Sequence, residues 1–380
     1  MTTATVMAGA PANNLTLYHR VRFNVGDPTA LVTLDDGRTI FMCRNIEMER
    51  ARTHVCADEV TCPQEHAPTG GLSTDRPTET AQALVELLKK HGVTRVRSDA
   101  TLQLVYAEHL RKAGIEVVYD PDLGTKSRRA KDAQEVEWLR EAQSMTEEAM
   151  EMACTMIARA KPRADGVLMH DGAELTSERV NSEIDIFFLK HNYTTPGNIV
   201  AGGADGGDCH HHGSGLLYTG QPVIVDIFPQ NRKTRYNGDC TRTVVNGRIP
   251  DEIARMHKAV CEAKKASVDM TRPGATGDAL YQTCINVIRK HGWDRGLPTP
   301  DSSPDYCSMQ HGLGHGVGLE VHEPPLLDTG GLPLVVGDCL TIEPGLYHRR
   351  LGGVRVEDMV IVTETGYVNL NHLHEGLDWT

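Results

Sequence analysis

The stretch HGLGHGVGLEVHE (residues 311–323) decides how the rest of the chain is interpreted. It carries three histidines, His311, His315 and His322, among four glycines. Because glycine has no Cβ, such a stretch lets another backbone approach closely and lets the chain bend sharply. Imidazole nitrogens bind metals and exchange protons near neutral pH. The stretch therefore predicts that a histidine is presented to a crowded, chemically active site.

Two acids lie upstream in patterns typical of strands. Side chains alternate along a strand, so Asp226 shares a face with Ile224 in the apolar run PVIVDIF (222–228). A second strand pattern, GDCTRTVV (238–245), carries Asp239. The segment between the two patterns is long enough for the loop of a hairpin. We expect this hairpin to bring Asp239 beside Asp226.

Two further acids repeat the arrangement nearer the carboxyl end. Glu343 lies in the strand pattern DCLTIEPG (338–345), and Glu357 lies in GVRVEDMVIVT (353–363) with Arg355 on the same strand face. A buried carboxylate without a partner costs on the order of several kcal/mol, or it takes up a proton. One arginine is too little positive charge for four such acids, whereas carboxylates between two metal ions form a known type of hydrolytic site. The histidine stretch would supply a nitrogen ligand.

Length and composition restrict the class of protein. A chain of 380 residues suits two domains. A formal net charge of −12 opposes binding to nucleic-acid phosphates, and no apolar run approaches the length of a membrane span. The amino terminus lacks the basic and apolar regions of a secretory signal. We therefore expect a cytoplasmic enzyme that binds neither nucleic acid nor membrane.

The order of the predicted elements indicates where the two domains meet. Strand and helix patterns alternate over residues 29–120, and the polar segment 121–132 then precedes a long helical pattern at 133–160. We place a small α/β domain at 15–125 and a larger domain at 126–380. Within the larger domain the patterns predict three more helices, at 176–190, 250–268 and 276–291.

The ordered motifs VDIF, GDCTRT, HGLGHGVGLEVHE, TIEPGLY and GVRVEDMVIV resemble those of the pita-bread metallopeptidases. This family comprises Xaa-Pro dipeptidases (prolidases), Xaa-Pro aminopeptidases and methionine aminopeptidases. The likeness spans roughly residues 130–380, and the preceding domain looks like the creatinase or prolidase amino-terminal domain, which favours the proline-directed branch. The resemblance implies a mixed α/β (α+β) chain, with a carboxyl-terminal pita-bread fold after a smaller creatinase-type α/β domain.

Carried over residue by residue, the resemblance implies a site for two divalent metal ions, with Asp239 and Glu357 shared by both. The ligands that it implies are Asp226, Asp239, His315, Glu343 and Glu357. Among these, Glu343 would also move a proton during hydrolysis. Tyr236 and Tyr347 are interpreted as walls of the pocket, and His311 matches a position that holds histidine in part of the family.

Three further residues are implied to act in catalysis. His322 would bind and protonate the substrate near the scissile bond, His210 would be a second site histidine, and Arg355 would hold the ligand carboxylates. Because Cys209 stands where the family usually has proline before that histidine, the register among residues 210–212 stays open.

The hard oxygen ligands favour manganese over thiolate-selected zinc, with cobalt, iron or zinc as alternatives. We expect a homodimer that hydrolyses short proline-containing peptides as an Xaa-Pro dipeptidase. An Xaa-Pro aminopeptidase is the alternative, because Leu326 stands where some prolidases carry an arginine that binds the carboxylate of the dipeptide. Outside the peptidases, the alternatives are a metal-free creatinase-like hydrolase and a non-catalytic peptide-binding module. Both of these normally lack ligand acids that this chain keeps.

Overall fold

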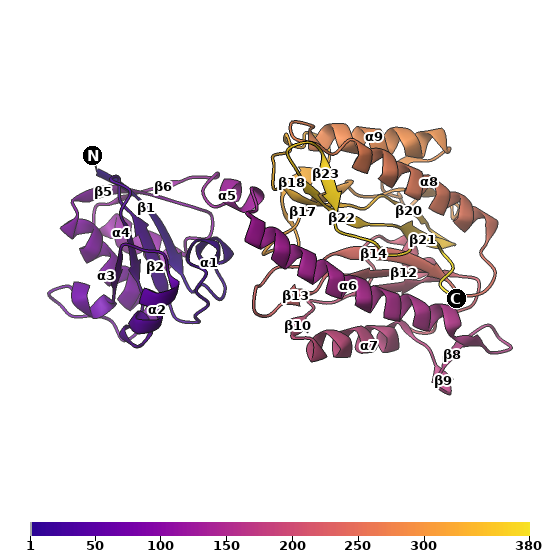
Figure 1. Ribbon diagram of the computed structural model, residues 1–380, viewed down its shortest axis with the longest axis horizontal. Coiled ribbons are helices and arrows are strands. Elements are labelled where there is room, and N and C mark those ends of the chain that lie inside the picture. Colours follow the sequence, from indigo (N-terminus) through magenta and orange to yellow (C-terminus); the bar gives the residue numbers. More distant parts are fainter. Residues whose placement is uncertain (1) are drawn as a thin grey trace. The chain divides into compact units, whose positions relative to one another are not determined.

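The computed structural model describes residues 2–380, and these form two compact units that meet in the chain at Arg128 and Arg129 (Figure 1). No helix in this described part of the chain is both long enough and apolar enough to cross a membrane. Each unit has its own hydrophobic core.

The amino-terminal unit is built on one six-stranded sheet with the strand order β4-β3-β2-β1-β5-β6. β1 pairs antiparallel with β2 and parallel with β5. The strands are β1 (Thr2–Gly9), β2 (Thr29–Thr33), β3 (Thr39–Met42), β4 (Glu59–Thr61), β5 (Val93–Ser98) and β6 (Glu116–Tyr119). The helices are α1 (Leu15–Val21), α2 (Met48–His54), α3 (Arg76–Lys90), α4 (Leu104–Lys112) and α5 (Thr125–Arg129), with short 3₁₀ turns η1 (Asn45–Glu47) and η2 (Pro63–His66).

Both faces of this sheet are buried, because successive side chains of a strand point to opposite faces. Val6 belongs to the apolar cluster that contains Leu84 of α3, whereas its neighbour Met7 belongs to the cluster that contains Leu17 of α1. The predicted alternation of strands and helices at residues 29–120 is thus present. β1, which the sequence patterns did not indicate, forms the middle of the sheet.

The carboxyl-terminal unit places two pairs of helices against a group of sheets (Figure 1). Its helices are α6 (Ala133–Arg159), α7 (Ser177–Lys190), α8 (Asp251–Asp269) and α9 (Gly277–Lys290), which agree with the four helical patterns of the sequence. α6 and α7 pack with β12 and β14 in one apolar cluster, whereas α8 and α9 pack with β19, β21 and β22 in another. The site described below lies between the strands of these two halves.

Three sheets of this unit carry the site, with the orders β11-β12-β14, β15-β16-β20-β21 and β18-β17-β19-β22-β23. Their strands are β11 (Ile199–Gly202), β12 (Pro222–Ile227), β14 (Cys240–Val245), β15 (Asp294–Arg295), β16 (Cys307–Met309), β17 (Gly314–Gly316), β18 (Glu323–Leu327), β19 (Cys339–Ile342), β20 (Gly345–His348), β21 (Gly352–Arg355), β22 (Asp358–Val362) and β23 (Tyr367–Asn369). Smaller pieces are β7 (Lys161–Pro162), β8 (Leu168–His170), β9 (Ala173–Glu174), β10 (Tyr193–Thr194), β13 (Gln230–Asn231) and the 3₁₀ turn η3 (Gly203–Gly207).

The sequence patterns predicted that the second pair of acids would lie inside continuous strands, and this prediction is wrong. The pattern at 338–345 divides into β19 and β20, and the pattern at 353–363 divides into β21 and β22. β19 pairs with β22 in one sheet, while β20 pairs with β21 in another. The first of these segments therefore passes from one sheet to the other at Glu343, and the second does so at Glu357. Pro344 has no N–H to donate to a strand ladder, which explains why β19 ends there.

The first pair of acids also departs from the prediction in part. Asp226 lies within β12, but Asp239 directly precedes β14. β12 and β14 pair antiparallel, as expected of the hairpin, with Asp226 opposite Thr241. Three of the four acids thus stand at strand ends, where the backbone can turn their carboxylates toward a common point.

Candidate metal centre

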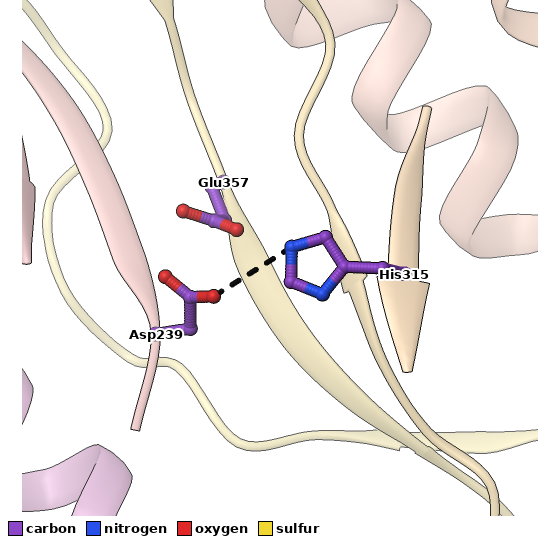
Figure 2. A group of neighbouring side chains, drawn as sticks. All are labelled: Asp239, His315 and Glu357. Carbon is purple, nitrogen blue, oxygen red and sulfur yellow. Dashed lines mark ion pairs between the residues drawn. The ribbon is translucent and has the colours of Figure 1, made fainter. Parts of the chain in front are cut away.

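Three buried side chains converge at the centre of the carboxyl-terminal unit. Asp239, His315 and Glu357 each offer one ligand atom, and these atoms lie within 4.8 Å of one another. Figure 2 shows the ring of His315 directed toward the carboxylate of Asp239, with Glu357 beside them. The His315 Nε2 atom lies 3.8 Å from an oxygen of Asp239 and 3.3 Å from an oxygen of Glu343. Residues from four separate chain segments therefore form one cluster.

Asp226 and Glu343 extend the cluster along the wall of a cavity of about 430 Å³. Asp226 accepts a 2.7 Å hydrogen bond from Nη2 of Arg355, and the Thr341 hydroxyl donates to Glu343 at 3.2 Å. The five residues that the sequence analysis named as metal ligands all line this cavity. The structure therefore places four carboxylates and one imidazole around a single space.

The charges of these acids are not balanced by the side chains beside them. Burial, followed by the charges of Glu357, Asp226 and Glu343, raises the pKa of Asp239 well above its usual value. Burial, followed by Glu343 and Asp226, does the same to the pKa of Glu357. Carboxylates that repel one another in a dry site are stable as anions only with added positive charge. The donor set therefore fits hard divalent cations, which bind carboxylate oxygens and imidazole nitrogen.

Glu343 behaves differently from the other two acids. Burial alone would raise its pKa, but the hydrogen bond and the charge of His315 outweigh burial and lower the pKa to about 2. Burial likewise opposes the charged form of His315, yet the hydrogen bond that its ring donates to Glu343 raises the pKa of that imidazole. These two side chains stabilise each other's charges at the edge of the cluster.

Local hydrogen bonds fix the ring of His315. Its Nδ1 atom lies 3.1 Å from the carbonyl of Gly316, which can only accept a hydrogen bond, so Nδ1 carries a proton and Nε2 faces the acids. The backbone N–H of His315 donates to the Thr341 hydroxyl at 3.0 Å. Loss of the Nε2 proton gives the tautomer that binds a metal through Nε2.

The glycines around His315 have the role that the sequence suggested. A Cβ on Gly314 would collide with the carbonyl of Thr341, and a Cβ on Gly316 would lie 2.5 Å from the carbonyl of Pro324. Contacts this short do not occur for real Cβ atoms, so the neighbouring strands would have to move apart. Glycine therefore lets β17 lie close enough to β18 and β19 for His315 to reach the acids.

Arg355 binds Asp226 and Tyr347 through its guanidinium. Its guanidinium donates to the Tyr347 hydroxyl at 2.8 Å and to the carbonyl of Cys209 at 3.2 Å, in addition to Asp226. β21 ends at Arg355 and β22 begins at Asp358, so Glu357 lies outside the strand that carries Arg355, but both side chains line the cavity. Arg355 is thereby fully engaged at the base of the cavity.

The two tyrosines interpreted as pocket walls do not line the cavity, and that interpretation is corrected. The Tyr347 hydroxyl lies beneath the wall, 2.5 Å from Nε2 of His311, which does line the cavity. Tyr236 is buried, and its hydroxyl donates to a carboxylate oxygen of Glu135 on α6. Both rings support the site from outside the cavity.

The remaining histidines line the cavity from two sides. The ring of His322 lies 4.2 Å, centre to centre, from that of His315, and burial, followed by the charge of His315, lowers the pKa of His322. His210 and His212 both line the cavity, whereas the ring of His211 faces Asp205 at 3.7 Å. The register that the sequence left open therefore allows two of the three consecutive histidines to reach the site.

Several cavity residues gave no signal in the sequence. Ile199, Phe228 and Val321 supply an apolar wall, and Asp328 lies after β18, beside Leu326, whose position the sequence analysis had already singled out. Leu326 is 59% exposed although it faces the cavity. Such residues are ordinary apolar or turn residues in a linear sequence, and only the fold brings them together.

The arrangement defines a class of protein, a metallohydrolase with a buried carboxylate and histidine centre, and comparison with known proteins identifies its family. Residues 137–364 match Metallopeptidase family M24, so the chain belongs to that family. This match confirms the predicted family, and the pita-bread fold and the metallopeptidase class that the resemblance implied are confirmed with it. The family and the donor set together imply divalent metal ions at this site.

Individual relatives extend the comparison. The chain is 37% identical to the Xaa-Pro dipeptidase of Pyrococcus furiosus over 148 residues, which is 39% of this chain and 38% of that protein. It is 30% identical to the probable dipeptidase PepE of Mycobacterium bovis over 68% of this chain and 63% of the relative. The chain thus matches less than two thirds of the length of these curated relatives.

Solved structures show the same fold over nearly the whole chain. The Xaa-Pro dipeptidase from Bacillus anthracis has a TM-score of 0.80 at 22% identity and covers 99% of this chain and 94% of its own. The X-Pro aminopeptidase from Thermotoga maritima has a TM-score of 0.78 at 21% identity, with 99% of this chain and 97% of its own covered. At this level of identity the comparison establishes the fold alone.

Proposed function

We propose that this protein is a metal-dependent exopeptidase that hydrolyses the Xaa-Pro bond of short peptides, acting as an Xaa-Pro dipeptidase. The observation that carries the proposal is the convergence of four acids and His315 on one cavity, with His322 beside them. Similarity to an Xaa-Pro dipeptidase and to a probable dipeptidase supports the substrate class. The preserved acids oppose the metal-free hydrolase and the non-catalytic binding module.

Five side chains would hold two divalent ions at this site, and Asp239 and Glu357 are proposed to be shared between them. The ligands are Asp226, Asp239, His315, Glu343 and Glu357. When bound, such ions lower the pKa of water and polarise a carbonyl group, which is the chemistry that peptide hydrolysis requires. Mainly oxygen ligands favour manganese, with cobalt, iron or zinc as alternatives.

The chain's own groups would bind the substrate and move its protons. Glu343 lies at the edge of the cluster, where its carboxylate oxygen can accept the proton of the attacking water and pass it on. His322 lies beside His315 and lines the cavity, where its ring could donate a hydrogen bond to the carbonyl of the scissile bond. Arg355 orients the carboxylate of Asp226 through the 2.7 Å hydrogen bond. His210, which also lines the cavity, is proposed to contact the substrate.

An Xaa-Pro aminopeptidase is the second candidate, and the environment of Leu326 favours it. In the described chain, Arg355 is the one guanidinium that lines the cavity, and no lysine lines it. Because the guanidinium of Arg355 already donates to Asp226, Tyr347 and Cys209, it is not free to bind the carboxylate of a dipeptide. A longer peptide, which continues beyond proline, has no free carboxylate next to the proline and so needs no cation near Leu326.

A comparison of two substrates tests the proposed function. For a dipeptidase, we expect the manganese-loaded protein to hydrolyse an Xaa-Pro dipeptide with a higher kcat/KM than a tripeptide that begins with the same two residues. A preference for the tripeptide of more than tenfold would contradict the dipeptidase assignment and support the second candidate. Hydrolysis of neither peptide would contradict both.

The substitution Leu326→Arg tests how the site recognises the substrate's end. A guanidinium at this position could bind the free carboxylate of a dipeptide, and one hydrogen bond between charged groups contributes about 1.5 kcal/mol or more. We therefore expect kcat/KM for the dipeptide to rise about tenfold, with little change for its carboxyl-amidated form. Leu326→Met is the control, because it keeps an apolar side chain of similar volume.

The remaining expectations concern the whole protein. We propose that the amino-terminal unit is a creatinase-type domain, with the catalytic domain beginning near residue 126. We also propose that two copies of the chain form a homodimer. Light scattering of the purified protein would measure its mass against 41.7 kDa for one chain.

A further inference from the structure

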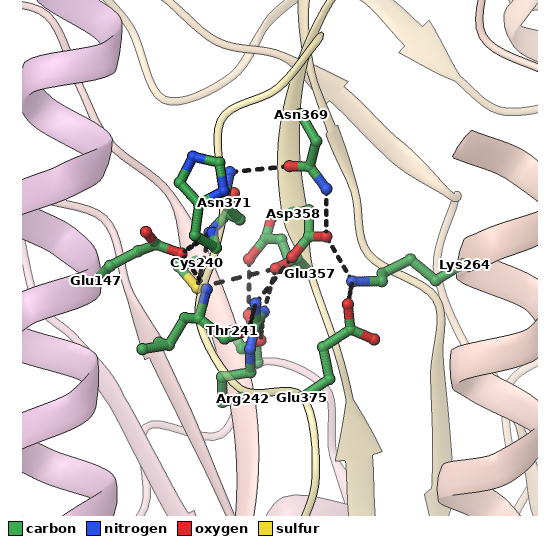
Figure 3. A network of polar contacts seen from close by, with 12 residues as sticks. Glu147, Cys240, Thr241, Arg242, Lys264, Glu357, Asp358, Asn369, Asn371 and Glu375 are labelled. Atoms are coloured by element: carbon green, nitrogen blue, oxygen red, sulfur yellow. Dashed lines mark hydrogen bonds and ion pairs between the residues drawn. The ribbon is translucent and has the colours of Figure 1, made fainter. Parts of the chain in front are cut away.

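The segment that follows β23 lies behind the metal-ligand cluster. Its residue Asn371 is 6% exposed. Figure 3 shows Asn371 next to Glu147 and Cys240, close to the start of β22. The Asn371 Nδ2 atom donates to Glu147 at 3.1 Å, so the side chain is held from α6. Asn371 does not line the cavity, and it is therefore out of reach of a substrate there.

Asn371 connects the two chain segments that carry the central acids. Its Oδ1 atom accepts a 2.8 Å hydrogen bond from the backbone N–H of Met359, two residues after Glu357. The same oxygen accepts a 2.9 Å hydrogen bond from Nε2 of Gln143, a fully buried side chain of α6. One amide oxygen thus joins β22 to the helix behind Asp239.

Gln143 forms two hydrogen bonds with the backbone of Asp239. Its Nε2 atom donates to the carbonyl of Asp239 at 2.7 Å, and its Oε1 atom accepts from the N–H of Asp239 at 2.8 Å. Asp239 precedes β14, so these bonds replace those of a strand ladder at that residue. Gly238 allows this approach, because a Cβ there would lie 2.7 Å from the carbonyl of Ala142 on α6.

A direct bond between strands completes the connection. The Thr241 hydroxyl donates to the carboxylate of Glu357 at 2.7 Å, and the backbone N–H of Glu357 donates to the carbonyl of Thr241 at 3.1 Å. Asp239 and Glu357 are thereby fixed relative to each other from two directions, through Thr241 on one side and through Gln143 and Asn371 on the other.

We propose that Asn371 and Gln143 are positioning residues of the metal centre, which set the separation of the Asp239 and Glu357 carboxylates without touching metal or substrate. This inference rests on the metal centre proposed above. The two residues act through backbone atoms, so their loss changes where the ligands lie but leaves every ligand in place. Loss of such outer hydrogen bonds typically reduces metal affinity by about 10- to 100-fold.

Titration calorimetry of the full-length, metal-free protein with Mn²⁺ tests the proposal. We expect Asn371→Ala and Gln143→Met each to weaken Mn²⁺ binding at least about tenfold. Asn246→Ala is the matched control, because Asn246 is 4% exposed and its Nδ2 atom donates to three carbonyls at the end of α6, away from the ligands. We expect this variant to lose thermal stability but to bind Mn²⁺ within twofold of the wild type.

A charge exchange gives a second test that remains available if Asn371→Ala does not fold. Asn371→Asp alone places two carboxylates together at Glu147 and should weaken Mn²⁺ binding. In the double variant with Glu147→Gln, the amide of residue 147 can donate to the carboxylate of residue 371. The net charge is then the same as in the wild type. We expect the double variant to bind Mn²⁺ within threefold of the wild type, and an affinity as low as that of Asn371→Ala would count against the proposal.

The outcomes separate this inference from the metal centre itself. If the wild type binds Mn²⁺ and both Asn371→Ala and Gln143→Met bind it equally well, the positioning role is wrong and the metal centre stands. Equal losses of affinity in Asn371→Ala and Asn246→Ala would also overturn it, since general destabilisation would then explain both. If the wild type binds no Mn²⁺, both the proposed metal centre and the positioning role are wrong.

Discussion

Asp239→Ala should reduce hydrolysis of Xaa-Pro substrates by more than about 100-fold, and the purified variant should contain less bound metal, because removal of a ligand exceeds the effect of an outer hydrogen bond. The carboxylate of Asp239 lies in the centre of the cluster, close to both His315 and Glu357. Glu343→Ala should have a similarly large effect, since Glu343 is proposed both as a ligand and as the group that accepts the proton. Steady-state kinetics and metal analysis of each variant measure both effects.

Asp165→Ala is the matched control for this prediction. Asp165 is an exposed acid of the same unit that pairs with Arg163, and it is not part of the cavity. Its removal should leave kcat/KM unchanged. If Asp239→Ala keeps more than a tenth of the wild-type activity while still folded, the carboxylate centre is not the catalytic site.

Arg242→Met should lower the free energy of unfolding by about 3 to 5 kcal/mol, because it removes one partner of a buried ion pair. Arg242 is fully buried in the network of Figure 3, with Nη2 donating to Asp358 at 2.9 Å and Nε donating to the carbonyl of His374 at 2.9 Å. Without the guanidinium, Asp358 keeps Lys264 at 2.5 Å, but backbone carbonyls of both β14 and the terminal segment lose a donor. Urea unfolding measures the change.

Arg163→Met serves as the comparison for this stability prediction. Arg163 pairs with Asp165 and Glu174 at the surface, where solvent screens the charges. Its unfolding midpoint should stay close to that of the wild type. Equal midpoints for Arg242→Met and Arg163→Met would show that the buried network does not stabilise the fold.

The elements that depend on local pattern could be predicted from the sequence. The long helix α6 begins at a capping box formed by Asp132 and Glu135, and its apolar stripe is visible in the sequence. Its predicted and observed bounds agree closely for that reason. β1 was missed because its residues, TTATVMAG, are small and weakly patterned, and its partners are β2 and the distant strand β5.

The candidate ligands could be predicted because a buried carboxylate in an apolar strand pattern needs a positive partner. The order of the motifs that carry these acids also resembled a known family. The breaks in the strands at Glu343 and Glu357 could not be predicted in this way, because they arise where two segments of the chain pass from one sheet to another. Only Pro344 marked either break locally.

The supporting residues carried no comparable signal. Gln143 and Asn371 are 228 positions apart, and each is an ordinary polar residue in its own segment. Their role follows from three-dimensional packing, which brings α6 and the terminal segment to the same strand end. Tyr347 was placed near the site by the resemblance, but its position beneath His311 required the fold.

The most direct test of the central claim is anomalous diffraction from crystals of the protein soaked in manganese. The proposal predicts two anomalous peaks enclosed by the side chains of Asp226, Asp239, His315, Glu343 and Glu357. The absence of any peak among these residues, at a manganese concentration that labels other sites on the protein, would contradict it.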